Sequence, residues 1–243
     1  KITFNINEIN MKYDKAFVIG SKKLSKNRLK RFYSKNKLKD IEITLWPAVI
    51  GTEVDINYYK KEQFLTDDFK INLVGSLGCL LSHATLWKKC AEDQKCNIAL
   101  IFEDDAIIKE DFNMKVEQIK ESHLPKDWTI LRLSYKGLKG KPISETVVKP
   151  DSIKKKGVNA GTWCYLLNTK NVQTLFDIIL PYNNKNSMDV VMRNNMEELK
   201  IYFSKYNHAI HYEKNYSPRK DLNLQKKNLF QMIKFSFRKF FKN

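Results

Sequence analysis

Three consecutive carboxylates follow a short apolar run in this chain, and their type and spacing suit metal chemistry. Ile98 to Phe102 contains no polar residue, a pattern typical of a strand that is covered on both faces of a sheet. Glu103, Asp104 and Asp105 follow directly, and in such sheets ligands bind beyond the carboxyl ends of the strands. Adjacent carboxylates repel each other, so this group favours a bound cation, and oxygen ligands suit Mg²⁺ or Mn²⁺. A solvated acidic turn is the alternative interpretation.

The segments around this strand predict an α/β fold, because strands and helices alternate along the chain. The helix before the acidic strand is amphipathic, with Leu80, Ala84, Trp87 and Ala91 recurring at helical spacing. The expected strands are Ala16–Ile19, Ile41–Val49, Ile98–Phe102, Trp128–Leu133, Thr162–Leu167 and Ile201–Tyr206. The expected helices are Lys22–Leu38, a short one within Glu53–Leu73, Cys79–Asp93, Asp111–Ser122, Lys170–Ile179 and Met188–Leu199, and a polar loop is expected over Lys136–Val158.

Length and cysteine usage constrain the class of protein. A chain of 243 residues with 42% hydrophobic content can bury a core as one large domain with an appendage. No run approaches the ~20 apolar residues that span a bilayer, so a cytoplasmic location is expected. The four cysteines form no Cys-x-x-Cys pair and are expected to be free thiols, mostly buried.

The formal charge of +17 is concentrated in two segments. Lys22 to Lys39 holds nine basic residues and no acidic one, and Lys214 to Asn243 holds nine basic residues against Asp221 alone. Fields of this sign attract nucleic acid, anionic lipid or phosphorylated substrates. Surface lysines that only keep the protein soluble explain part of this excess of positive charge. The boundary between an N-terminal domain, 1–213, and a basic tail, 214–243, is expected at this second segment.

Several blocks of the sequence, taken together, resemble a known family. They are Phe17-Val-Ile19, Arg28, Trp46-Pro-Ala-Val49 with Gly51, Gly75-Ser-Leu-Gly-Cys-Leu-Leu-Ser-His83 with Trp87, Ile101-Phe-Glu-Asp-Asp105, Gly161-Thr-Trp-Cys-Tyr-Leu-Leu167 and Met188-Asp189. In this order they resemble glycosyltransferase family 25, the bacterial lipooligosaccharide galactosyltransferases. The resemblance runs from about Ala16 to about Ser217.

The resemblance implies a GT-A fold, which is a Rossmann-like mixed sheet flanked by helices. It also implies a UDP-sugar donor, Mn²⁺ or Mg²⁺ as cofactor, and inversion at the anomeric carbon. Asp105 is expected to bind the metal with Glu103, and Glu103 or Asp104 to contact the donor ribose or a metal-bound water. Arg28 can pair with the donor diphosphate, since a guanidinium binds phosphate in a bidentate manner. The alternative for Arg28 is a solvated position on a basic helix.

Other candidate residues keep two interpretations each. His83 matches the family block and is a candidate donor contact, although a buried, hydrogen-bonded histidine is the ordinary expectation at this spacing. Ser82 can bond back to its own helix. His208 or His211, after the last expected strand, could complete a metal site or lie at a sheet edge. Asp189 is the candidate base for the acceptor hydroxyl, or else an acid that stabilises a helix N-terminus; Glu103 or Asp104 could serve as base instead.

The tail predicts attachment to a membrane surface. Its apolar residues recur at helical spacing between flanking basic residues: Leu229, Met232, Ile233, Ser236, Phe237, Phe240 and Phe241 line one stripe. A basic amphipathic helix rich in phenylalanine is typical of an interfacial anchor at an anionic membrane. The same stripe could instead pack on the domain itself.

The family resemblance implies an inverting, metal-dependent hexosyltransferase. Such an enzyme would most simply move galactose from UDP-galactose onto a lipooligosaccharide or related glycan or glycolipid acceptor, and the tail would place it at the inner face of the cell membrane. Two alternatives stay open. A basic nucleic-acid-binding protein explains the charge but not carboxylates at a strand end, which would repel phosphate, and so no nucleic-acid partner is expected. A catalytically silent relative could act as an assembly partner.

Overall fold

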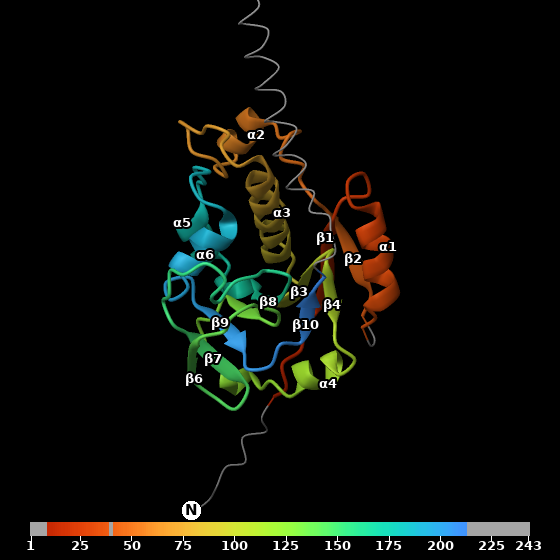
Figure 1. Cartoon of the computed structure of the whole chain (residues 1–243). Helices are drawn as coiled ribbons and strands as arrows, with labels where there is room; N and C mark the ends of the chain where they lie inside the picture. The colour runs from red at the N-terminus through yellow and green to blue at the C-terminus, as the bar shows by residue number, and fades with distance from the viewer. Residues whose placement is uncertain (1–8, 39–40, 213–243) are drawn as a thin grey trace, which may run out of the picture.

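The strand that ends in the acidic run is an interior strand of a mixed sheet in this computed structural model, which describes residues 9–38 and 41–212 (Figure 1). This strand is β3 (Ile98–Glu103), and both of its faces are buried. The other seven strands of the sheet are β1 (Lys15–Gly20), β2 (Ile43–Pro47), β5 (Ile130–Arg132), β6 (Gly140–Pro142), β7 (Val147–Pro150), β8 (Cys164–Asn168) and β9 (Ile201–Ser204).

The order of the strands is β2-β1-β3-β8-β5-β9-β7-β6. β1 is parallel to β2 and to β3, whereas β8 is antiparallel to its neighbours β3 and β5. Ile19 of β1 lies opposite Glu103 of β3. The carboxyl ends of these two strands therefore meet at one edge, where the loop after β1 lies next to the acidic run. A mixed α/β sheet flanked by helices, as the sequence predicted, is confirmed.

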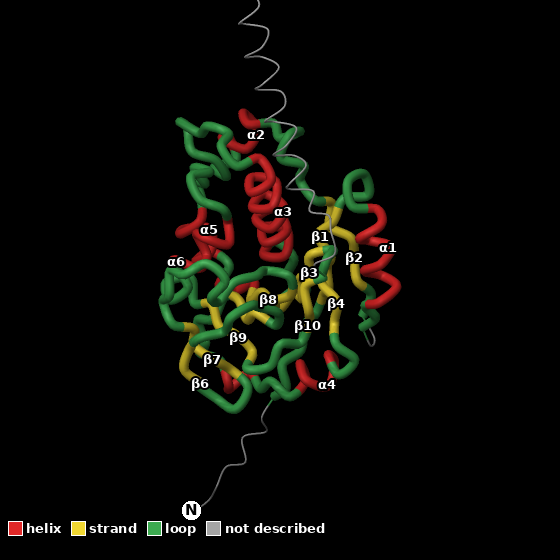
Figure 2. Tube along the Cα trace, in the orientation of Figure 1, coloured by secondary structure: helices red, strands yellow, loops and turns green. Residues whose placement is uncertain are grey.

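Helices cover both faces of the sheet (Figures 1 and 2). The helices are α1 (Lys26–Lys35), α2 (Ile56–Lys61), α3 (Val74–Ala91), α4 (Phe112–Glu117), α5 (Gln173–Ile179) and α6 (Met188–Asn194), with 3₁₀ turns at Glu121–His123 and Thr169–Asn171. Side chains of α3, α5 and α6 pack with Ala99 and Ile101 on one face. Side chains of α1 and α4 pack with Leu100 and Phe102 on the other. This alternation explains why the β3 sequence is apolar throughout.

The central helix α3 begins five residues before the helix expected from Cys79. Glycine destabilises a helix in isolation, so the glycines at positions 75 and 78 were expected to precede the helix and not to lie within it. In the structure the lack of a side chain at Gly78 is needed for packing, because a Cβ there would lie 2.6 Å from the Val49 carbonyl oxygen. Close contact with the loop after β2 therefore extends the helix. This contact brings the face that carries Cys79 and His83 beside the end of β3.

Four short strands were not expected from the sequence. β6 and β7 form a hairpin within the segment expected to be a loop. β4 (Ala106–Ile108) and β10 (Ala209–His211) form a separate antiparallel pair in which His211 lies opposite Ala106. In strands of three or four residues the alternation of apolar and polar side chains is too short to be recognised in the sequence. The β4–β10 pair brings residue 211 beside the acidic run.

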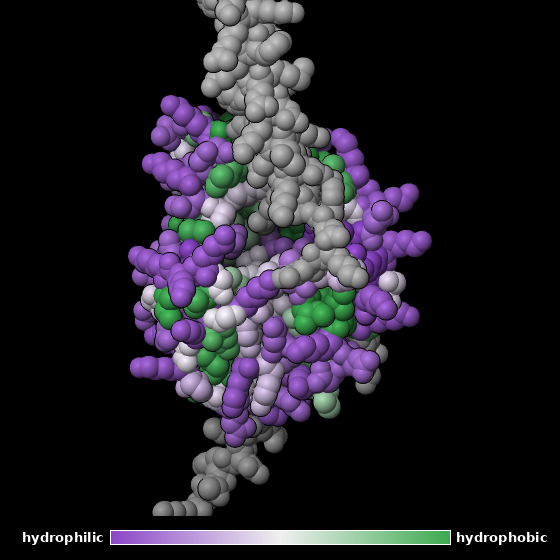
Figure 3. Space-filling model, viewed as in Figure 1, coloured by the Kyte–Doolittle hydropathy of each residue, from purple (hydrophilic) through white to green (hydrophobic). Residues whose placement is uncertain are grey.

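The remaining expectations concern the cysteines, the tail and the membrane. Cys90, Cys96 and Cys164 are buried, Cys79 is half-buried, and none forms a disulfide, as predicted. The basic tail, 214–243, lies outside the described residues. Among the described helices, none is both long enough and apolar enough to cross a membrane. Hydrophilic side chains cover most of the described surface on the face drawn in Figure 3, with apolar patches between them.

Candidate active site

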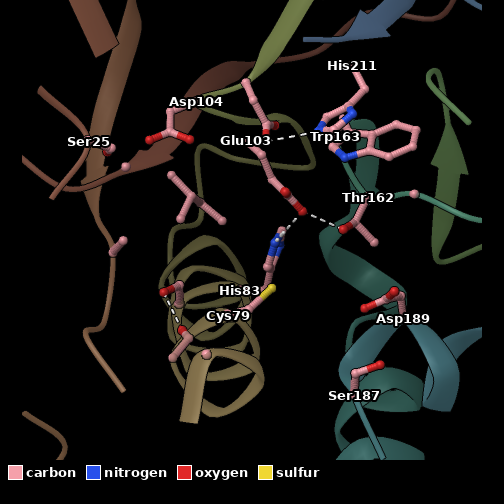
Figure 4. A pocket seen from close by; sticks show the side chains of 18 of the residues that line it. Ser25, Cys79, His83, Glu103, Asp104, Thr162, Trp163, Ser187, Asp189 and His211 are labelled. Carbon is pink, nitrogen blue, oxygen red and sulfur yellow. Dashed lines mark hydrogen bonds and ion pairs between the residues drawn. The ribbon is translucent and has the colours of Figure 1, made fainter. Parts of the chain in front are cut away.

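A cavity of about 710 Å³ lies at the carboxyl ends of β1 and β3. Its wall combines the loop after β1, the loop after β2, one face of α3, the acidic run, the segment before β8 and the start of α6. Six of the candidate residues from the sequence line it: Arg28, His83, Glu103, Asp104, Asp105 and Asp189. Residues that are up to 161 positions apart in sequence thus share one site, and most of their side chains are drawn in Figure 4.

Arg28 places one positive charge against two of the three carboxylates. Its Nη2 forms ion pairs with Asp104 Oδ1 and with Asp105 Oδ2, the latter at 2.6 Å. The side chain of Arg28 is only 16% exposed. It is therefore not a solvated residue of the basic helix, and its charge offsets the repulsion between the adjacent aspartates.

Asp104 turns toward α1 and Ser25 (Figure 4). Burial raises its pKa to about 6, although the Arg28 charge and a hydrogen bond from Ser25 act in the opposite direction. The charges of Asp105 and Glu103 add to the increase. Asp104 thus lies at the wall of the cavity between the β1 loop and the acidic run.

Glu103 turns the other way, toward α3 and β8. Its Oε1 accepts a hydrogen bond from Thr162 Oγ1 and lies 3.4 Å from His83 Nε2 (Figure 4). The opposite ring nitrogen, His83 Nδ1, lies 2.7 Å from the Tyr165 hydroxyl, which also accepts a hydrogen bond from Trp87 Nε1 at 2.8 Å. His83 is 1% exposed. His83 is thus a buried histidine whose two ring nitrogens both have partners, and it also lines the cavity. A hydrogen-bonded core position and a contact with a donor are therefore compatible for this residue.

Asp105 contacts the histidine contributed by β10. Asp105 Oδ2 lies 3.1 Å from His211 Nε2, and the His211 ring stacks on Trp163 with ring centres 4.5 Å apart. Asp105 Oδ1 is buried and has no hydrogen-bond partner among the described residues. A carboxylate oxygen and an imidazole nitrogen therefore meet at the cavity wall. Both are ligand types that divalent cations accept.

His208 lies away from this site. Its Nε2 is 2.6 Å from Ser204 Oγ, and its ring packs edge-on against Phe112. Burial lowers its pKa to about 4, and the Lys115 charge contributes. Of the two histidines considered for the metal site, only His211 reaches the acidic run. Ser82 bonds within the fold, because its hydroxyl donates to the Gly78 carbonyl and accepts from Val49 N–H.

Asp189 occupies the facing wall of the cavity, in the first turn of α6 (Figure 4). The charge of Asp189 acts on Arg132, which is 1% exposed and lies at the end of β5. Arg132 Nη1 donates to the Asn159 carbonyl at 2.7 Å, and its Nε and Nη2 have no hydrogen-bond partner among the described residues. Burial lowers the Arg132 pKa to about 10, and the charge of Asp189 is the largest influence in the opposite direction.

Sequence reasoning missed several members of the site. Ser25, Thr162, Trp163, Tyr165 and Arg132 contact or face the candidate residues. Trp163 and Tyr165 lie within a block quoted for the family resemblance, so that block was a usable signal. No signal in the chain distinguished Arg132, because an arginine at the end of a strand is ordinarily exposed.

Comparison with known proteins decides the family. Residues 13–192 match the profile of glycosyltransferase family 25, described as an LPS biosynthesis protein. This chain belongs to glycosyltransferase family 25. The family 25 transferase thus carries its acidic run, His83 block and Asp189 within the matched region, whereas His211 lies beyond it. A search of curated proteins gave no significant match.

Solved glycosyltransferase structures show distant similarity to the family 25 transferase. GlyE of Streptococcus pneumoniae TIGR4 is 11% identical with a TM-score of 0.35, over 78% of this chain and 43% of that chain. A Drosophila β-1,4-galactosyltransferase 7 mutant, solved with manganese, UDP-Gal and xylobiose, is 10% identical with a TM-score of 0.35, over 83% and 71%. The galactosyltransferase LgtC, solved with donor and acceptor sugar analogues, is 10% identical with a TM-score of 0.35, over 78% and 72%.

Proposed function

We propose that this family 25 enzyme is an inverting, metal-dependent hexosyltransferase that transfers galactose from UDP-galactose to a lipooligosaccharide or related glycan acceptor. One observation carries the proposal. A single cavity holds Arg28, Asp105 and His211 on one wall and Asp189 on another. The first group suits a nucleotide diphosphate with its cation, and the second suits an acceptor hydroxyl.

The proposed cation site consists of Asp105 and His211, with Glu103 at its margin. Mn²⁺ and Mg²⁺ are commonly held by one or two protein carboxylates together with substrate phosphates, so a small protein ligand set is sufficient. The buried Asp105 Oδ1, which has no hydrogen-bond partner among the described residues, fits this assignment. When bound, such an ion stabilises the negative charge that develops on the diphosphate leaving group.

Arg28 is the proposed diphosphate contact. Its guanidinium already lies against the aspartates and lines the cavity, with Nε lacking a hydrogen-bond partner among the described residues. The ion pair holds the side chain in place before a donor arrives, which reduces the entropy that binding must overcome. A guanidinium at this position can bond two phosphate oxygens at once.

Asp189 is the proposed base. The acceptor oxygen attacks the anomeric carbon while its proton passes to the Asp189 carboxylate, and the bond from that carbon to the donor phosphate breaks. The charge of Asp189 acts on the buried guanidinium of Arg132 and opposes the lowering of its pKa, so the two side chains interact. Asp189 lies in the first turn of α6 and lines the cavity, where its carboxylate can meet an acceptor hydroxyl.

The proposed attachment to an anionic membrane rests on the tail alone, which lies outside the described residues. Its phenylalanine stripe and net charge of +8 beyond residue 213 fit an interfacial helix. A lipid-linked acceptor would make attachment useful, because it confines enzyme and acceptor to one surface.

The deciding experiment is a screen of nucleotide sugars for release of nucleoside diphosphate in the presence of Mn²⁺ and a lipooligosaccharide acceptor. We expect UDP-galactose to give release that requires Mn²⁺ and acceptor, and the product to carry an inverted linkage. Asp105→Asn should abolish it, whereas the exposed matched variant Asp68→Asn should not. Turnover of Asp105→Asn at a near-normal rate and low Mn²⁺ would contradict the metal assignment. No release from any nucleotide sugar would favour a catalytically silent relative.

A further inference from the structure

Cys79, His83 and Glu103 form a compact group at the floor of the cavity. Cys79 and His83 lie one helical turn apart on the same face of α3, and Glu103 ends β3 across from them (Figure 4). Their ligand atoms all lie within 4.8 Å of one another. In the part of the chain that the structure describes, it is the one group of three or more such side chains with this spacing.

We propose that these three residues form a second cation site, selective for a thiolate-binding divalent ion of the zinc class. Sulfur, imidazole and carboxylate with one open position is a ligand set typical of zinc. Two ligands about 2.1 Å from a tetrahedral ion are about 3.4 Å apart. His83 Nε2 and Glu103 Oε1 are separated by 3.4 Å. Two of the three ligands therefore already have tetrahedral spacing, and the Cys79 sulfur lies within 4.8 Å of both.

The surroundings hold the ligands in place. The Tyr165 hydroxyl holds the His83 ring at Nδ1 and itself accepts a hydrogen bond from Trp87, so that His83 Nε2 faces Glu103. Thr162 fixes the Glu103 carboxylate. Hydrogen bonds of this kind, made by groups behind the ligands, orient ligands at protein metal sites and contribute to affinity.

Charge and ligand softness separate this site from the one proposed at Asp105. The thiolate and carboxylate together carry two negative charges, which a divalent ion neutralises. Binding displaces the thiol proton of Cys79 to solvent and forms the sulfur–metal bond. The Asp105–His211 pair offers oxygen and nitrogen, which suit Mn²⁺, whereas a thiolate favours softer ions.

One consequence rests on the proposed function. Glu103 belongs to both the zinc-class group and the margin of the donor site, so an ion held by Cys79 and His83 withdraws Glu103 from the donor. Zinc should then inhibit transfer, and added Mn²⁺ should not relieve the inhibition, because the two ions have separate principal ligands. Binding at the cysteine site does not depend on the transferase proposal.

Binding can be tested with Co²⁺ as a coloured substitute for Zn²⁺ in metal-free protein. We expect thiolate-to-cobalt absorption and the visible bands of tetrahedral cobalt, both removed by equimolar Zn²⁺. Cys79→Ser and His83→Gln should weaken Co²⁺ binding at least tenfold. Cys96→Ser, which removes another thiol, and Asp105→Asn should retain the signal. Retention in Asp105→Asn distinguishes this site from the proposed Mn²⁺ site.

A spectrum that is unchanged in Cys79→Ser, or lost equally in Cys96→Ser, would overturn the proposal. Alkylation of the unmutated protein provides a second measurement that does not depend on a variant folding. Mass spectrometry should find that Zn²⁺ slows modification of Cys79 at least tenfold. Equal rates with and without Zn²⁺ would also overturn it.

Discussion

His211 Nε2 lies 3.1 Å from Asp105 Oδ2, although 105 residues separate the two in the chain. The contact depends on the β4–β10 pair, which sets His211 opposite Ala106, the residue after Asp105. Stacking on Trp163 fixes the plane of the imidazole ring. A backbone pairing and an aromatic contact thus place an imidazole nitrogen beside a carboxylate oxygen.

Replacing His211 with Gln should weaken Mn²⁺ binding by about 10- to 100-fold, the usual effect of disturbing a metal site by one group. Electron paramagnetic resonance of free Mn²⁺ measures the binding directly. His208→Gln is the matched control, because His208 is buried against Ser204 and does not reach the acidic run. Equal Mn²⁺ affinity in His211→Gln and the unmutated protein would exclude His211 from the proposed site.

Asp189→Ala should lower kcat by about 10²- to 10⁴-fold while changing donor affinity little, because a base acts in the transition state. Kinetics at saturating donor, with donor binding measured separately by calorimetry, separate these effects. Asp177→Ala on the exposed side of α5 serves as the control. Weaker donor binding at unchanged kcat would make Asp189 a binding residue.

Tyr165→Phe should lower the free energy of unfolding by about 1–3 kcal/mol, because it leaves the buried Nδ1 of His83 and Nε1 of Trp87 without this bonding partner. Denaturant unfolding measures the change. Tyr135→Phe is the control, because the Tyr135 hydroxyl donates to the Lys205 carbonyl at an exposed site. This variant should change the free energy of unfolding by less than about 0.5 kcal/mol. If both variants lose the same stability, the buried network contributes nothing beyond a surface hydrogen bond.

Stability should fall in acid because of His208. Its folded pKa of about 4 lies below the ordinary value of 6.5, so the unfolded chain binds the proton first as the pH falls. The contribution is complete above pH 6.5 and is lost between pH 6.5 and about 4, on the order of 3 kcal/mol.

His208→Gln should remove this dependence, and His123→Gln should keep it. Unfolding free energies at several pH values between 4 and 7 test the claim. Parallel curves for His208→Gln and the unmutated protein would show that another group is responsible.

Deleting residues 226–243 should release the protein from anionic vesicles and leave transfer to a small soluble acceptor intact. The chemistry is proposed for residues between Arg28 and His211, all of which this deletion retains. Raised salt should weaken vesicle binding only partly, because screening removes the lysine attraction and leaves the burial of phenylalanine. Vesicle flotation and a thermal scan check the result. Aggregation of the shortened protein with loss of thermal stability would mean that the stripe packs on the domain.

The acidic strand, the helix before it and the α/β class could be predicted because long or buried elements have a recognisable pattern of apolar residues in the sequence. β3 and α3 are examples, and the position of Glu103 at a strand end followed from them. The hairpin of β6 and β7 could not be predicted, since three or four residues are too few to reveal alternation. The early start of α3 depends on tertiary contact at Gly78, which local helix preference cannot include.

The sequence pointed to some of the residues that line the cavity, but not to how they are arranged. The sequence grouped Glu103, Asp104 and Asp105 as one cluster, whereas the structure directs them to three different neighbours. The direction of each side chain depends on partners from distant elements, and a single sequence does not reveal these. The choice between His208 and His211 likewise depends on how β10 pairs.

The pairing of β10 with β4 also bears on synthesis of the protein. Domains generally begin to fold from the N-terminus while the chain is still being made. Asp105 cannot meet its histidine until residue 211 has emerged from the ribosome, after all eight strands of the main sheet have been made. A chain interrupted before that point would carry the carboxylates but lack the imidazole, so the cation site that we propose would be incomplete in a partly made chain.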